Sequence, residues 1–320
     1  MKKFILSLLI GLLLMTFNLA LVVPRPLAAE KLKVGTSMKV YAGYYLPMLV
    51  AEEKGYWREN GLEAEWVPFA AGADFFRALA SGSVFFGIST AVGGVQTTAR
   101  GVPMVITSEF VTKDPFLVWV LADSRFKELR DLKGAKVGVP RFGASPHAFG
   151  QAMAKALGIE VRWVSIGGMT ELLGGFKVGR VDVILQPLSI VVRMKAGGEV
   201  RDIGSVADFL PREWMEHATF AHKDFAKKNP DTVRKAIKTL LQGVDFLKNN
   251  PRWAIEKMRS EEGLSESAAR LVFQGIQFTK DGRVDKKAVE NIKNFLAEYG
   301  IISKDKVPAT EEFFVPGLAG

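Results

Sequence analysis

The spacing of hydrophobic residues changes twice along the chain. From residue 31 to about residue 108, short apolar runs alternate with segments of helical spacing, which predicts strands separated by helices. The alternation of strand and helix patterns is interrupted near residues 112–115 and continues from Phe116 to His222. From Phe225 onward the spacing is helical only, with an apolar stripe that includes Val233, Ile237 and Leu240. The pattern predicts an α/β protein with mostly parallel sheets flanked by helices.

Two segments of the chain repeat each other. Residues 61–89 and 158–186 align without a gap, and each reads as strand, loop, helix, glycine and strand. Identical residues occupy several paired positions: Gly61/Gly158, Glu63/Glu160, Trp66/Trp163, Val67/Val164, Gly82/Gly179 and Val84/Val181. Any two units of this kind look somewhat alike, but the shared Glu-x-x-Trp-Val favours a common layout. Two similar lobes would face each other across a cleft that can hold a small ligand.

The break in rhythm divides the chain into lobes. We expect residues 113–222 to form the second lobe, and residues 30–112 together with 223–320 to form a discontinuous first lobe. The late helices lack strands of their own and are expected to pack back on the first lobe. The two passages near Lys113 and His222 would then form a two-strand hinge.

Residues 1–29 resemble an export signal. Lys2 and Lys3 precede the apolar segment 4–23, prolines follow, and small residues stand before Glu30. This arrangement predicts a cleaved signal peptide, with cleavage near Ala29/Glu30 and a periplasmic protein. The alternative is an uncleaved anchor, because the segment is about long enough to cross a bilayer.

Composition excludes several kinds of site. The chain has no cysteine, so lipid attachment, a thiol nucleophile and a thiolate metal site are ruled out. Without Lys2, Lys3 and Arg25 the net charge falls from +9 to +6, and the remaining basic residues are spread along the chain. We therefore expect no nucleic-acid partner, although the excess mildly favours an anionic ligand.

Ligands of open α/β sheets bind beyond the carboxyl ends of the strands, which selects the candidate positions. The loop after the first strand supplies Met38, Tyr41, Tyr44 and Tyr45, whose rings suit a ligand wall or could pack under the next helix. Ser89 and Thr90 follow the third strand, and the repeat makes Gln186 the counterpart of Ser89. These polar residues could contact a ligand or only cap helices.

A strand, glycine turn and helix start occur together at residues 136–147. Gly143 allows close approach of the backbone to a ligand, Ser145 can cap the helix, and Arg141 can pair with an anion. Thr170 begins another helix on the same side. The alternatives are a plain cap for Ser145 and a solvated charge for Arg141.

Enzymatic motifs are missing from the sequence. It contains no phosphate-binding loop, no dinucleotide fingerprint and no Gly-x-Ser-x-Gly elbow. The three histidines, His147, His217 and His222, lack the spacing of a helical zinc site. We expect no catalytic residues, no metal and no cofactor.

Four stretches resemble the substrate-binding proteins of ABC importers, in the group that handles sulfonates, nitrate, taurine and thiamine pyrimidine precursors. They are residues 47–63, 78–84, 99–103 and 131–139. The resemblance implies a two-lobed type II periplasmic binding protein fold that closes on one small molecule and docks on a membrane permease. Two departures concern the first lobe: Phe85 replaces an acidic residue that the second lobe keeps as Asp182, and Ser89-Thr90 replaces a small-Asp-Ala-Pro turn.

The sequence therefore predicts an exported, monomeric solute-binding protein that captures a small organic anion and delivers it to an ABC permease without catalysis. One alternative is a membrane-anchored periplasmic sensor or scaffold. A remote alternative is an enzyme resembling those that make a pyrimidine precursor, although such relatives use a cysteine-rich segment that this chain lacks.

Overall fold

The computed structural model describes residues 29–36, 43–114 and 116–318. The predicted signal segment and two candidate site residues, Met38 and Tyr41, lie outside the described residues. Among the described residues, no helix combines the length and the apolar composition that crossing a bilayer requires.

The first sheet has six strands in the order β11-β4-β10-β3-β1-β2. β1 pairs in parallel with β2 and β3, whereas β10 runs antiparallel to both of its neighbours, β3 and β4. The strands are β1 (Glu30–Thr36), β2 (Leu62–Pro68), β3 (Phe86–Thr90), β4 (Met104–Lys113), β10 (His217–His222) and β11 (Gln277–Phe278).

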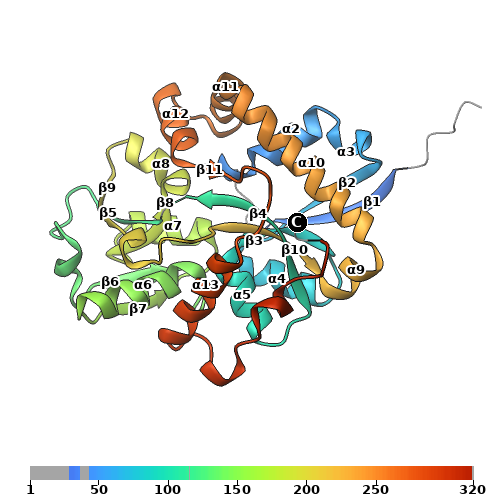
Figure 1. Cartoon of the computed structure of the whole chain (residues 1–320). Helices are drawn as coiled ribbons and strands as arrows, with labels where there is room; N and C mark the ends of the chain where they lie inside the picture. The colour runs from blue at the N-terminus through green and yellow to red at the C-terminus, as the bar shows by residue number, and fades with distance from the viewer. Residues whose placement is uncertain (1–28, 37–42, 115, 319–320) are drawn as a thin grey trace, which may run out of the picture.

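The second sheet has five strands in the order β7-β6-β8-β5-β9. β6 pairs in parallel with β7 and β8, and β5 runs antiparallel to β8 and β9. The strands are β5 (Phe116–Leu121), β6 (Lys136–Val139), β7 (Arg162–Ser165), β8 (Val183–Pro187) and β9 (Val200–Ser205). Figure 1 shows this sheet, in green and yellow, beside the first.

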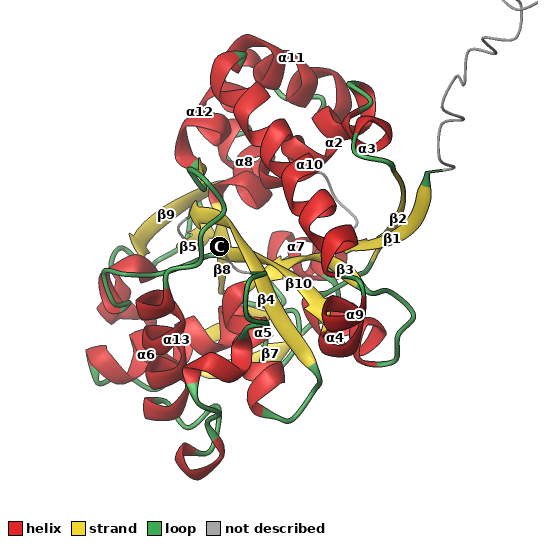
Figure 2. Ribbon diagram, turned by 45° about the vertical axis from the view of Figure 1, so that its right-hand side comes forward, coloured by secondary structure: helices red, strands yellow, loops and turns green. Residues whose placement is uncertain are grey.

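Helices cover both faces of the first sheet, as Figure 2 shows. One face packs on α2 (Leu46–Glu53), α3 (Tyr56–Glu59), α10 (Pro230–Asn249), α11 (Pro251–Glu262) and α12 (Glu266–Gly275); the other packs on α4 (Gly72–Ala80), α5 (Ala91–Ala99) and α13 (Lys286–Glu298). α9 (Lys223–Lys228) follows β10. The second sheet carries α6 (Ser145–Leu157), α7 (Met169–Lys177) and α8 (Leu188–Ala196). Short 3-10 turns occur at Gly43–Tyr45, Leu129–Leu132, Val206–Phe209, Lys304–Lys306 and Thr310–Phe313.

The repeated segments occupy equivalent places in the two sheets. The order β2-β1-β3 in the first sheet matches β7-β6-β8 in the second, with parallel pairing throughout. The predicted two-lobed α/β fold with helices flanking each sheet is confirmed. The sheets are mixed rather than mostly parallel, because β4, β5, β9, β10 and β11 pair antiparallel with their neighbours. The two departures noted in the sequence have local explanations: the Asp182 carboxylate accepts a bond from the backbone N–H of Lys136, whereas the ring of Phe85 stacks on Phe225 on the surface.

The chain passes between the sheets twice. Asp114 lies on the first passage, between β4 and β5. The predicted second lobe extends to His222, but β10 is an inner strand of the first sheet. The return passage therefore lies before His217. The pattern of apolar residues predicts that a segment is a strand but not which sheet the strand joins. The predicted C-terminal boundary of the second lobe, at residue 222, therefore lies too far along the chain.

Candidate functional site

A cavity of about 350 Å³ lies where strands of both sheets end, between loops and helices of the two lobes. From the first lobe it is lined by Tyr44, Ala70, Ala71, Gly72, Ala73, Phe76, Arg77, Ser89, Thr90, Gly93, Gln96, Thr97, Arg100 and His217. From the second it is lined by Phe116, Pro140, Arg141, Phe142, Gly143, Ala144, Ser145, Pro146, Met169, Gln186, Pro187 and Ile190. The position follows the rule that ligand sites lie beyond strand ends.

The cavity gathers most of the residues that the sequence singled out. Seven of them line it: Tyr44, Ser89, Thr90, Arg141, Gly143, Ser145 and Gln186. Tyr45 instead packs in the core of the first lobe, against the ring of Tyr44. Thr170 does not line the cavity, although the residue before it, Met169, does. Met38 and Tyr41 are not described.

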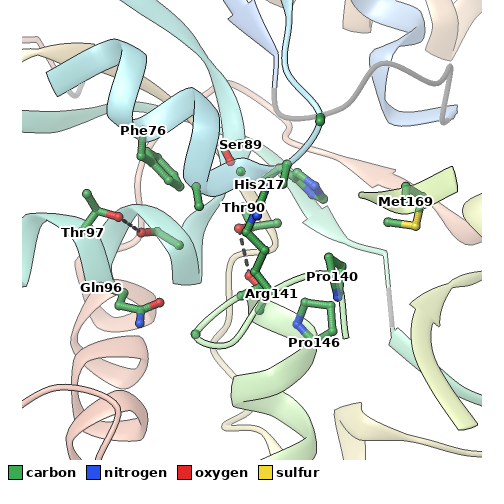
Figure 3. A pocket seen from close by; sticks show the side chains of 18 of the residues that line it. Phe76, Ser89, Thr90, Gln96, Thr97, Pro140, Arg141, Pro146, Met169 and His217 are labelled. Carbon is green, nitrogen blue, oxygen red and sulfur yellow. Dashed lines mark hydrogen bonds between the residues drawn. The ribbon is translucent and has the colours of Figure 1, made fainter. Parts of the chain in front are cut away.

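Polar contacts join the two lobes across this cavity. The Ser145 hydroxyl donates to the Thr90 hydroxyl at 2.9 Å, a bond drawn in Figure 3, and Arg141 Nη2 lies 3.5 Å from Asp74 Oδ2. Ser145 is the first residue of α6 and Ala144 holds the N-cap position, so the expected capping role of Ser145 is wrong. Its hydroxyl is free of that role and reaches the other lobe. The lobes are therefore closed on each other.

Gln96 makes a third link between the lobes. In the amide orientation that its neighbours favour, Nε2 donates to the backbone oxygen of Gly143 at 2.6 Å and Oε1 accepts from Arg100 at 2.8 Å. Gly143 has a φ of +80°, which glycine adopts without strain, and this turn brings its carbonyl to Gln96. The predicted glycine turn thus positions a backbone group at the cavity.

Arginines supply the formal charges on the cavity wall. Arg77, Arg100 and Arg141 line it, and none of the lining residues is acidic. The Asp74 carboxylate pairs with both Arg77 and Arg141. Among the described residues, no ion pair is formed by Arg100, whose guanidinium bonds only the neutral amide of Gln96 in the contacts above. The cavity wall therefore offers one guanidinium without a carboxylate partner.

His217 is a cavity residue that the sequence analysis considered only as a metal ligand. It begins β10 opposite Thr90, and its ring stacks on Tyr44 with 4.4 Å between ring centroids. Burial lowers the pKa of His217 to about 3, so the imidazole is neutral at physiological pH. His217 lies at the end of a strand, where ligand sites form, but the sequence does not show which sheet that strand joins.

Two helices supply further wall residues that the sequence analysis missed. Gly93, Gln96 and Thr97 recur at helical spacing along α5, Arg100 is its C-cap residue, and Arg77 projects from α4. A polar stripe on a helix that is otherwise buried was the available signal. Within the part of the chain that the structure describes, no three His, Asp or Glu side chains gather as metal ligands would.

Buried carboxyl groups lie on both passages between the sheets. Asp114 is 2% exposed and accepts a hydrogen bond from the Ser189 hydroxyl at 3.2 Å. Burial raises the pKa of Asp114 from 3.8 to about 7. Glu216, directly before β10, has a pKa raised well above its ordinary value by burial and by the Asp114 charge. Burial therefore disfavours the charged form of both carboxyl groups.

Comparison with known proteins identifies the family. The family described as "NMT1/THI5 like" matches residues 42–254. A Brucella abortus (strain 2308) protein provisionally named a binding protein is 26% identical over 253 residues, covering 74% of this chain and 76% of its own. The 4-amino-5-hydroxymethyl-2-methylpyrimidine phosphate synthase THI12 of Saccharomyces cerevisiae is 22% identical over 223 residues, covering 65% of this chain and 64% of its own.

Solved structures show the same fold. The Candida albicans CA3427 product, described as having the generic periplasmic binding protein fold, matches with a TM-score of 0.74 and 17% identity, covering 88% of this chain and 94% of its own. The aliphatic sulphonate binding protein SsuA of Escherichia coli matches with 0.69 and 18%, covering 90% and 97%. The nitrate-binding protein NrtA of Synechocystis PCC 6803 matches with 0.66 and 14%, covering 88% and 84%. The chain therefore belongs to the NMT1/THI5-like family and has the periplasmic binding protein fold found in the solute-binding components of ABC importers.

Proposed function

We propose that this protein is an exported solute-binding protein that captures a small organic anion between its lobes and passes it to an ABC permease. The observation that carries the proposal is the cavity itself, which both lobes line and which contains three arginines and no acidic residue. A group bound there contacts both lobes only when they are closed, so the ligand favours closure. The fold and the Brucella relative support binding rather than catalysis.

Arg100 is the residue we expect to hold the anionic group. Its guanidinium has no carboxylate partner in the described part of the chain, whereas Arg77 and Arg141 share Asp74. A guanidinium can donate two parallel bonds to a carboxylate, sulfonate or phosphate. The anion would then occupy the place of the counter-charge that the protein does not supply.

Replacing Arg100 with glutamine should weaken anion binding at least about tenfold, because a charge-assisted bond contributes roughly 1.5–3 kcal/mol. Screening the mature protein against alkanesulfonates, nitrate, carboxylates and aromatic acids by thermal shift, followed by calorimetric titration, measures the effect. Arg252→Gln is the matched control, because Arg252 is an exposed residue of α11 that does not line the cavity, and it should leave the affinity unchanged. A protein that binds none of these anions would contradict the proposed function.

Export and processing have their own test. If residues 1–29 are a cleaved signal, the protein recovered from the periplasm should have a mass that begins at Glu30. A mass that begins at Met1, with the protein in the membrane fraction, would instead favour the anchored sensor or scaffold. The described chain begins directly before β1, and none of residues 29–36 lines the cavity, so either outcome is compatible with ligand capture.

A further inference from the structure

Three polar side chains in the cavity wall each have a buried atom without a protein partner. These atoms are Ser89 Oγ, Gln186 Nε2 and His217 Nδ1, on side chains only 0%, 2% and 3% exposed. Leaving such an atom unpaired costs about 1–3 kcal/mol, so natural proteins rarely tolerate several together. Three of them around one cavity indicate a place shaped for a polar group of the ligand.

The three atoms come from both lobes and stand on well-held elements. Ser89 lies on β3 and His217 begins the adjacent β10, whereas Gln186 lies on β8 of the second sheet. The backbone oxygen of Gln186 accepts a bond from the Trp119 indole at 2.8 Å, and His217 stacks on Tyr44. A single ligand group that bonds all three would connect the two sheets.

This set of atoms carries no formal charge. Serine and glutamine are neutral, and the buried His217 imidazole is neutral at physiological pH. Glu216 precedes His217 in the chain, and the charge of Asp114 raises the pKa of Glu216. Burying a charge without an opposite partner is costly, and none of the three side chains supplies a positive charge for an anion. The arginines, by contrast, come from α4, the C-cap of α5 and the loop at residues 141–143.

We propose that Ser89, Gln186 and His217 bind an uncharged hydrogen-bonding group of the ligand, such as a ring nitrogen or a carbonyl. The Gln186 amide donates to an acceptor on the ligand, and the hydroxyl and imidazole donate or accept as the group requires. The inference rests on the proposed function and narrows its substrate class. The ligand is an anion with a second, neutral polar group, a heteroaromatic or acylated acid, rather than a simple alkanesulfonate or inorganic oxyanion.

A stability comparison tests this without any ligand. Methionine matches glutamine in length but makes no amide hydrogen bond, so Gln186→Met should leave the melting temperature of the ligand-free protein unchanged or higher. Gln96→Met is the matched control: Gln96 is also buried, at 4% exposure, but its amide bonds Gly143 and Arg100. The control should melt several degrees lower. If the melting temperature of Gln186→Met falls as far below that of the wild type as the melting temperature of Gln96→Met does, the inference is overturned.

A binding comparison tests the chemistry. Nicotinate and benzoate have the same charge and nearly the same shape, and only nicotinate has a ring nitrogen. Calorimetry of the wild-type protein should show nicotinate binding at least about tenfold more tightly, because a site built to hydrogen-bond rejects the analogue that lacks the partner. In Gln186→Met the difference should shrink to less than about threefold. Equal affinities in the wild type would overturn the inference while leaving anion capture intact. If no anion binds, the proposed function fails, and the melting comparison alone decides the role of the three side chains.

Discussion

Replacing Gly243 with alanine should destabilise the protein by about 3 kcal/mol, near the upper end for overpacked cores. Gly243 lies in the middle of α10, where the helix crosses α2, and a Cβ atom there would stand 2.2 Å from the backbone oxygen of Pro47. Backbone atoms cannot turn aside as a flexible side chain can. The two helices would have to separate, and the core beneath them would lose packing.

Gly174→Ala is the matched control for this prediction. Gly174 is also helical, in α7, but it is exposed and nothing lies within 4 Å of the added methyl group. Alanine is favoured over glycine inside a helix, so this variant should gain about 0.5–1 kcal/mol. Urea unfolding of the variants and the wild type measures both changes. A Gly243→Ala midpoint equal to that of the wild type would show that α2 and α10 are not packed as closely as described.

The Gly243 contact also matters for the cavity. α2 begins directly after Tyr44 and Tyr45, and Tyr44 is the wall residue that stacks on His217. The position of Tyr44 therefore depends on how closely α10 holds α2. We therefore expect Gly243→Ala to lower the ligand affinity as well as the free energy of unfolding.

Much of this architecture was predictable because it depends on local patterns. β5 is a continuous apolar run, and Ser265 and Asp285, residue types that favour helix starts, stand before α12 and α13 and accept the backbone N–H groups of Ala268 and Lys287. Cap residues and alternating apolar positions act over a few residues, so the sequence displays them directly.

What was missed depends on contacts between distant segments. β9 (Val200–Ser205) is largely polar and is a strand because it pairs with β5 at a sheet edge. His217 reaches the cavity because β10 inserts between β3 and β4, a choice of sheet that local periodicity cannot express. The wall residues on α5 likewise depend on which side of that helix faces the other lobe. Sequence reasoning therefore located the loops of the site better than its helices.

Replacing Asp114 with asparagine should stabilise the protein at pH 8 and leave its stability unchanged at pH 4. The pKa of Asp114 is about 7 in the folded protein, against 3.8 for an ordinary aspartate, because burial penalises the charged carboxylate. Between these values the folded state binds more protons than the unfolded state, so stability falls as pH rises. Above pH 7 both states are ionised and the loss is complete, at roughly 4 kcal/mol.

Asparagine removes this loss while keeping the local contact, because its amide oxygen can still accept the hydrogen bond from Ser189. Urea unfolding of wild type and variant at several pH values should therefore give curves that coincide near pH 4 and separate progressively up to pH 7. Glu109 and Glu262, whose pKa values are also raised, are present in both proteins and cancel in the difference. Glu216 does not cancel, because the Asp114 charge contributes to its raised pKa; asparagine removes that contribution, which acts in the same direction and adds to the benefit at high pH. Asp123→Asn, in the exposed turn after β5, is the control and should follow the wild type at every pH.

The direction of the effect distinguishes a buried carboxyl from a paired one. A carboxylate held by a cation has a lowered pKa, and its removal would destabilise the protein most at high pH. Asp114 is 2% exposed and is bonded by a neutral hydroxyl, so it should behave in the opposite way. A variant that is less stable than the wild type at pH 8 would show that a cation compensates Asp114. If Asp114→Asn stabilises the protein equally at pH 4 and pH 8, the gain comes from packing and not from ionisation of the Asp114 carboxyl.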